Sequence, residues 1–144
     1  MSNEMEKSIP DQTIARLFRN LSQPERVRIL FAIGEGESCV CHLEAMLELR
    51  QAYISQHLMA LREAGILTTR RDGRFVYYRL ANPELLVFLR QAGELTGLTA
   101  QELDNGMPAL QTGSCCCPKC VGEAAQASPL FGCQPQISAL TEAH

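Results

Sequence analysis

The stretch SCVCHLEAMLELRQAYISQHLMALREAGILTTRRDGRFVYYRL, residues 38–80, decides the fold of this chain. It predicts a short helix opened by a C-x-C motif, a second helix with a polar outer face, and a basic β-hairpin. In the second helix, Ile54, Leu58 and Leu61 recur at i, i+4 and i+7 and form one apolar stripe. The opposite side carries small, flexible or hydrogen-bonding groups that can enter a DNA major groove: Ala52, Ser55, Gln56 and Met59.

The segment after this helix predicts the hairpin. Gly65 can take a positive φ and so end the helix. Two strand-like runs, residues 66–71 and 74–80, are joined at Asp72-Gly73, a strong hairpin signal. Six arginines and two carboxylates between Arg50 and Arg79 give a charge of about +4, although the whole chain carries −3. Positive charge is therefore concentrated where a helix and a hairpin tip can grip phosphates.

Helices are also expected on the N-terminal side of this stretch. Residues 11–21 carry apolar side chains at i, i+3, i+4 and i+7: Ile14, Leu17, Phe18 and Leu21. A capping box at residues 22–25, with proline in the first turn, predicts the start of the next helix. The side of that helix expected to face the core carries Val27, Leu30 and Phe31.

On the C-terminal side, Asn82-Pro83 predicts the start of a long apolar helix that runs to about Gly97. A second capping box, Thr99 to Glu102, predicts a further short helix. Beyond residue 106, helical and strand periodicity disappears. That region holds four of the seven prolines and five of the seven cysteines.

The 144 residues fit one small domain with an extension at each end. We expect residues 1–10 to be flexible, residues 11–105 to form the domain, and residues 106–144 to form a flexible Cys-rich tail. No apolar run reaches the ~18 residues of a membrane span, and the polar N-terminus lacks the apolar core of a signal peptide. A cytoplasmic location without membrane contact is expected, where cysteines favour metal or redox chemistry over stable disulfides.

Four segments in series carry a family resemblance: ESCVCHL, YISQHLMALREAGIL, RRDGR and VYYRL. In this order they resemble the ArsR/SmtB family of metal-responsive winged-helix repressors, over about residues 12–97. The resemblance implies a mainly α winged helix-turn-helix fold with a small β-hairpin. It also implies a homodimer with the first and last long helices at its interface, and a repressor that leaves its operator DNA when a metal or metalloid binds.

Cys39 and Cys41 are the first candidate metal ligands. In mid-helix, residues i and i+2 point about 160° apart, but at a helix start one of them lies in extended backbone and both sulfurs can converge. The positive end of the helix favours the thiolate that binds metal. The alternative is that each cysteine is simply a small buried hydrophobe.

Two thiolates are fewer than arsenite prefers, and where arsenite-sensing relatives often have a third cysteine this chain has Glu44. The missing ligands are expected from the C-x-x-C-containing cluster of the tail: Cys115, Cys116, Cys117 and Cys120. That cluster could instead hold structural zinc, form a second non-regulatory site, or act as a thiol switch. His42 is a further candidate ligand, although a lone histidine beside a motif is more often a solvated side chain.

Matched to the family pattern, one set of residues is expected to contact double-stranded operator DNA. Gln51, Ser55 and Gln56 would read base edges, with Tyr53 near the backbone. The hairpin would contact phosphate or the minor groove through Arg71 and Arg74, with Arg70 behind them. The alternative, a solvated helix and a merely charged hairpin, explains each element alone but not the series.

The sequence therefore predicts a repressor, not an enzyme, that is released by arsenite or antimonite. Cadmium, lead or zinc are the alternative inducers. Other functions left open are a thiol redox or persulfide sensor and a metal-sequestering protein. A thiol-dependent arsenate reductase would need a phosphate-binding loop, and no cysteine is followed by an arginine at the required spacing.

Overall fold

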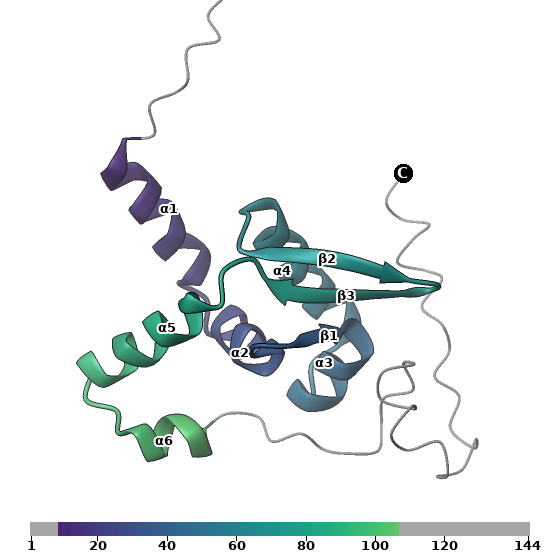
Figure 1. Cartoon of the computed structure of the whole chain (residues 1–144). Coiled ribbons are helices and arrows are strands. Elements are labelled where there is room, and N and C mark those ends of the chain that lie inside the picture. Colours follow the sequence, from purple (N-terminus) through teal and green to yellow (C-terminus); the bar gives the residue numbers. More distant parts are fainter. Residues whose placement is uncertain (1–8, 107–144) are drawn as a thin grey trace, which may run out of the picture.

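The structure is a computed structural model in which residues 9–106 are described. The elements follow in the order α1 (Pro10–Leu21), α2 (Pro24–Ile33), β1 (Glu37–Cys39), α3 (Val40–Leu47), α4 (Gln51–Glu63), β2 (Leu67–Asp72), β3 (Phe75–Leu80), α5 (Glu84–Leu95) and α6 (Ala100–Asn105) (Figure 1). The mainly helical fold class is confirmed. The expected flexible N-terminus, up to residue 8, and the Cys-rich tail, from residue 107, lie outside the described residues.

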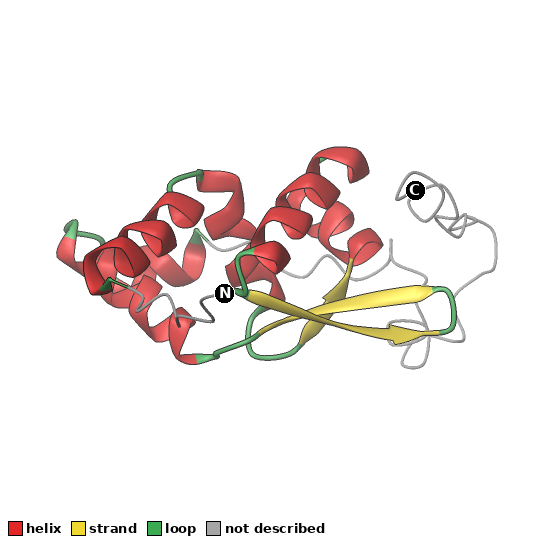
Figure 2. Ribbon diagram, turned by 90° about the horizontal axis from the view of Figure 1, so that it is seen from above, coloured by secondary structure: helices red, strands yellow, loops and turns green. Residues whose placement is uncertain are grey.

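The sheet is larger than the predicted two-stranded hairpin. β3 lies in the middle, with β2 on one side and β1 on the other, and both pairings are antiparallel. The sequence gives no signal for β1 because it has only three residues, directly before the helix that the C-x-C motif opens. The hairpin tip points away from α1, α5 and α6, so the molecule has two distinct ends (Figures 1 and 2).

The hairpin turn lies one residue later than predicted. Asp72 pairs with Phe75 across the ladder, so Gly73 and Arg74 are the two central turn residues. Gly73 has a φ of 59°. Arg74 does not have a positive φ, since Glu48 is the one non-glycine residue of the described part that does. A positive φ at the first central position alone is the pattern of a type II′ turn, which matches the twist of the paired strands.

The core forms where α2, α3 and α4 pack against one face of the sheet. The predicted stripe of α4 is confirmed, since Ile54, Leu58 and Leu61 are fully buried. The predicted core face of α2 is wrong in part. Val27 and Phe31 are only half-buried, whereas the fully or almost fully buried residues of α2 are Ile29, Leu30 and Ile33. The reason is that α2 contacts α1, α3, α4, α5 and β3, so it buries a wider surface than one stripe.

The cap predictions had different outcomes. The capping box predicted at residues 22–25 is wrong: Gln23 is the N-cap of α2, and the Ser22 hydroxyl instead donates to the Arg19 carbonyl at 2.8 Å. The hydroxyl thus closes the end of α1. The second box is confirmed, because Thr99 and Glu102 exchange both reciprocal hydrogen bonds at the start of α6.

Both ends of α5 lie slightly inside the predicted limits. The side chain of Asn82 accepts a hydrogen bond from the Glu84 amide at 3.0 Å, but the N-cap residue itself is Pro83. The helix ends at Leu95, and Gly97 follows with a φ of 94°. Gly65, the second residue after α4, has a φ of 78°, as predicted for the end of that helix. No described helix is long and apolar enough to cross a membrane.

Candidate functional site: a cysteine pair, a recognition helix and a basic hairpin

Cys39 and Cys41 lie at the junction between β1 and α3. Cys39 is the N-cap residue of α3 and has an extended backbone, with φ −86° and ψ 166°. Its side chain therefore points in the same direction as that of Cys41, and the two sulfurs are 3.0 Å apart. Cys39 is buried, with 2% of its surface exposed, while Cys41 is partly exposed. The geometric prediction from the helix start is confirmed.

The pair fits two positions of a thiolate metal site. The S–S separation is longer than the ~2.05 Å of a disulfide, and two thiolates on one tetrahedral ion with bonds of about 2.3 Å would lie about 3.8 Å apart. Closing around an ion therefore requires the sulfurs to separate by less than one ångström. Residues 9–106 contain no group of three His, Cys, Asp or Glu side chains placed to hold a metal. The two cysteines could therefore supply two of the ligands of a metal ion.

His42 is the other candidate ligand among the described residues. It lies in the first turn of α3 and is partly exposed, and Glu44, where arsenite-sensing relatives were expected to have a third cysteine, is partly exposed as well. The tail cysteines predicted to complete the site lie outside the described residues: Cys115, Cys116, Cys117 and Cys120. Their assignment stays a prediction.

The proposed base-reading residues lie along α4. Gln56 is exposed, Tyr53 is 40% exposed, and Gln51 and Ser55 are partly exposed. The stripe of α4 on the core side holds the helix against α2 and α3. The helix therefore presents hydrogen-bonding side chains to solvent, as base readout requires.

A part-buried junction that the sequence did not reveal fixes α4 to the preceding helices. The guanidinium of Arg26, in α2, donates from Nε to His57 Nδ1 at 3.2 Å and from Nη1 to the Asn20 carbonyl oxygen at 3.2 Å. His57 is 6% exposed, and Tyr53 meets its ring edge to face at 4.6 Å between centroids. His57 is thus a packed residue on the core side of α4.

The protonation state of His57 follows from these contacts. Because Nδ1 accepts from Arg26, the neutral ring carries its proton on Nε2, which is buried without a partner among the described residues. Burial, and secondarily the charge of Arg26, lowers the pKa of His57 below its ordinary value, while Glu25 opposes the shift. Arg26 was not found from sequence because it lies 31 residues from its partner.

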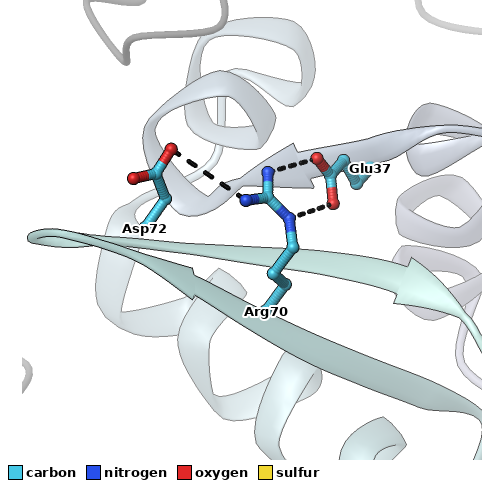
Figure 3. A network of polar contacts seen from close by, with 3 residues as sticks. All are labelled: Glu37, Arg70 and Asp72. Carbon is cyan, nitrogen blue, oxygen red and sulfur yellow. Dashed lines mark hydrogen bonds and ion pairs between the residues drawn. The ribbon is translucent and has the colours of Figure 1, made fainter.

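The three arginines near the hairpin tip have different surroundings. Arg71 and Arg74 are exposed. Arg70 forms a two-pronged ion pair with Glu37 of β1, donating from Nε at 3.1 Å to one carboxylate oxygen and from Nη2 to the other, and Asp72 lies 3.9 Å from Nη1 (Figure 3). Arg71 and Arg74 are therefore open to phosphate, while Arg70 is engaged within the sheet.

The helices at the opposite end expose an apolar surface. Ile14 and Phe18 of α1 and Val87 of α5 are 55%, 52% and 56% exposed, and Phe18 contacts Phe88 with ring centroids 6.0 Å apart. We name this the α1/α5 surface. α6 packs beside it, where Leu103 is buried against Gly93.

Helices α2, α3 and α4, together with a three-stranded sheet whose hairpin protrudes, define a class of protein. A solution structure of the homodimeric winged helix-turn-helix DNA-binding domain of Mb0332 from Mycobacterium bovis has the same fold, with a TM-score of 0.57. The two chains are 23% identical, and the alignment covers 67% of this chain and 90% of that one. The fold is therefore a winged helix-turn-helix.

Sequence comparison then identifies the family. The model of the bacterial regulatory proteins of the arsR family matches residues 23–69. The arsenic resistance transcriptional regulator ArsR1 of Pseudomonas putida is 53% identical over 70 residues, which are 48% of this chain and 54% of the relative. A cadmium resistance regulatory protein CadC homolog of Staphylococcus aureus is 33% identical over 94 residues, 62% of this chain and 78% of the relative. The chain belongs to the arsR family of bacterial regulatory proteins.

The match is concentrated in the DNA-binding part of the fold. The chain spans about half the length of the first of these relatives, and the family model covers α2 to the middle of β2. The family is one of regulatory proteins. Relatives named for arsenic and for cadmium resistance both match, so the comparison does not select one metal.

Proposed function

We propose that this chain is a homodimeric transcriptional repressor that binds operator DNA through α4 and the hairpin and leaves it when a thiophilic ion binds Cys39 and Cys41. The observation that carries the proposal is the convergence of the two sulfurs at the start of α3, directly before the recognition helix. Arsenite or antimonite is the first candidate for this ion and cadmium or lead the second; relatives named for arsenic and for cadmium resistance support an ion of this class without ranking its members.

The cysteine pair is suited to soft ions. Soft thiolate ligands select them, and the N-terminal end of α3 favours the ionised sulfur. A bound ion would supply a fixed bridge between the two thiolates. Only a ligand that prefers the conformation with weak DNA affinity can release the protein, and such coupling is typically about 1–3 kcal/mol.

The DNA face is supported by its chemistry. The exposed side chains of α4 match the hydrogen-bond pattern of base edges, and Arg71 and Arg74 offer charge to the phosphates beside them. The α1/α5 surface, in turn, is suited to a second copy of the chain. Its exposed Phe18 ring and aliphatic side chains belong to α1 and α5, which lie at the end away from the hairpin tip (Figure 1). Two copies joined there would present both recognition helices.

The test is a titration of the purified, reduced full chain on its own promoter DNA, first with arsenite and then with cadmium, following DNA release. Replacing Cys39 and Cys41 by serine should leave binding in the absence of ions intact and abolish release. Cys133→Ser is the matched control and should respond like the wild type. A Cys39/Cys41 double variant that still responds would refute the site.

The contribution of the tail is tested separately. A variant with serine at 115, 116, 117 and 120 should bind DNA normally and need higher concentrations of the ion for release. Unchanged release would exclude the tail as a source of ligands. Release by neither ion, in a protein that binds the promoter, would move the assignment to thiol oxidation as the signal.

A further inference from the structure

A row of side chains crosses the sheet from the cysteine pair to the hairpin. Cys39 pairs with Tyr77, and Tyr77 pairs with Arg70, so these three residues stand side by side on β1, β3 and β2. Residues directly opposite in an antiparallel ladder point to the same face. The guanidinium of Arg70 lies over the Tyr77 ring, 4.7 Å from its centroid, and Tyr77 is 1% exposed.

The side chain of Arg70 extends past Tyr77 and contacts the outer strand β1. Its ion pair is with Glu37, which lies two residues before Cys39 and therefore on the same face of β1 (Figure 3). β1 and β2 are not hydrogen-bonded to each other, because β3 lies between them. The Glu37–Arg70 pair is thus a side-chain link between the two outer strands across the central strand.

The Glu37–Arg70 link attaches a strand, β1, that has few other contacts with the sheet. β1 has three residues and pairs with the sheet along one edge only. The side chain of Glu37 is 19% exposed and meets the guanidinium with both oxygens, a geometry that fixes the two groups more firmly than a single contact does. A shift of β1 relative to the hairpin must therefore break this pair or carry Arg70 along.

We propose that Glu37 and Arg70 are positioning residues that couple the cysteine pair to the hairpin. The proposal rests on the proposed function. Separation of the Cys39 and Cys41 sulfurs around an ion displaces the end of β1, Glu37 moves with the strand, and the hairpin that carries Arg71 and Arg74 follows through Arg70. Arg70 thus acts on DNA affinity through Glu37 and not through a phosphate.

The first test compares the DNA dissociation constant with and without Cd²⁺ in full-length variants. In Arg70→Gln and in Glu37→Gln, ion-free affinity should change less than about twofold. The ratio of the two constants, typically about 5–150 for an allosteric protein, should fall at least threefold. The reversed pair, Glu37→Arg with Arg70→Glu, should restore part of the ratio. Arg71→Gln is the matched control and should weaken DNA binding without changing the ratio.

The same variants distinguish a direct phosphate contact. If Arg70 binds DNA itself, Arg70→Gln will weaken ion-free binding as much as Arg71→Gln does, and Glu37→Gln will strengthen it by releasing the guanidinium. In both variants the ratio would then stay at its wild-type value. That pattern would overturn the proposal.

A second readout needs no metal. The proposed link should transmit in both directions: DNA that holds the hairpin should also hold the end of β1. DNA binding should therefore slow alkylation of Cys39 and Cys41 by iodoacetamide, measured by mass spectrometry on the peptide that carries both. We expect at least threefold protection in the wild type and in Arg71→Gln, and less than about 1.5-fold in Arg70→Gln. If no ion releases the wild type from DNA but the protection pattern is observed, the proposed inducer is wrong, while the coupling between the cysteine pair and the hairpin is supported. Equal protection in Arg70→Gln would overturn the coupling.

Discussion

Two exposed surfaces of the molecule differ in chemistry. The outer side of α4 and the hairpin is polar and basic, with Gln56, Arg71 and Arg74 in solvent. The α1/α5 surface leaves Phe18 and Val87 more than half exposed. Apolar surface in water costs roughly 25 cal/mol per Å², whereas charged side chains remain well hydrated. The first surface therefore suits a partner that binds reversibly, and the second suits a partner that remains bound.

The largest expected effect comes from placing a charge on the α1/α5 surface. Phe18→Glu should dissociate the proposed dimer and lower DNA affinity about 100-fold, because a monomer reaches only one half-site. Since Phe18 is 52% exposed, the isolated fold should persist. Sedimentation velocity gives the oligomeric state, circular dichroism the fold, and fluorescence anisotropy the DNA affinity.

Gln12→Glu is the matched control for this variant. It adds the same charge to an exposed position of the same helix and should leave both the dimer and the affinity unchanged. A Phe18→Glu protein that sediments as a dimer would show that the second copy binds elsewhere.

A smaller effect is expected on the basic surface. Arg71→Gln should weaken DNA binding roughly tenfold, about equally on promoter and unrelated DNA, because a phosphate contact carries no sequence information. The slope of log K against log salt should become shallower by about one for each phosphate that the arginine neutralises in the wild type.

The control for this measurement is Arg90→Gln, on α5, which removes only an exposed ion pair with Asp104. Its affinity and salt slope should match the wild type. A full loss of promoter preference in Arg71→Gln, with binding to unrelated DNA unchanged, would make Arg71 a base reader instead.

The smallest effect concerns the junction between the two surfaces, where Arg26 holds Asn20 of α1 and His57 of α4. Because burial lowers the pKa of folded His57, the unfolded chain takes up a proton near pH ~6.5 that the folded chain does not. The contribution of neutral His57 to the free energy of unfolding is therefore complete above that pH. As the pH decreases toward the folded pKa, this contribution is lost by at most about 1.4 kcal/mol per pH unit.

Urea unfolding of wild type and His57→Gln between about pH 5 and 8 checks this prediction. The variant keeps an acceptor for Arg26 but cannot titrate, so its stability should decline less over the acidic half of that range. Equal declines in the two proteins would place the acid sensitivity in other groups.

Local sequence signals predicted the helices and the hairpin well, because they depend on neighbouring residues. The stripe of Ile54, Leu58 and Leu61 is read from spacing alone, and the convergence of Cys39 and Cys41 follows from the geometry of a helix start. Ser22 shows the limit of such signals. The same hydroxyl can cap the following helix or close the preceding one, and only the packed chain selects between them.

Contacts between distant residues were not predictable. The strand β1 forms because its three residues pair with β3, some 40 positions later in the chain. A stretch of three residues is too short for any periodicity to be detected. Arg70 reads in sequence as one more cation of the hairpin tip, and its partner Glu37 lies 33 residues away. The same holds for Arg26 and His57. The assignment of the tail cysteines stays a prediction, since residues 107–144 lie outside the described part.

The unequal exposure of the two cysteines bears on how quickly a signal is registered. Cys41 meets solvent while Cys39 is 2% exposed, so an ion that binds as proposed would reach Cys41 first and Cys39 in a second step. The first step would depend on the concentration of the ion, and the second on how often the end of β1 opens. At high concentrations the response time would then reach a limit set by the protein, and pulses shorter than that opening time would pass without a transcriptional response.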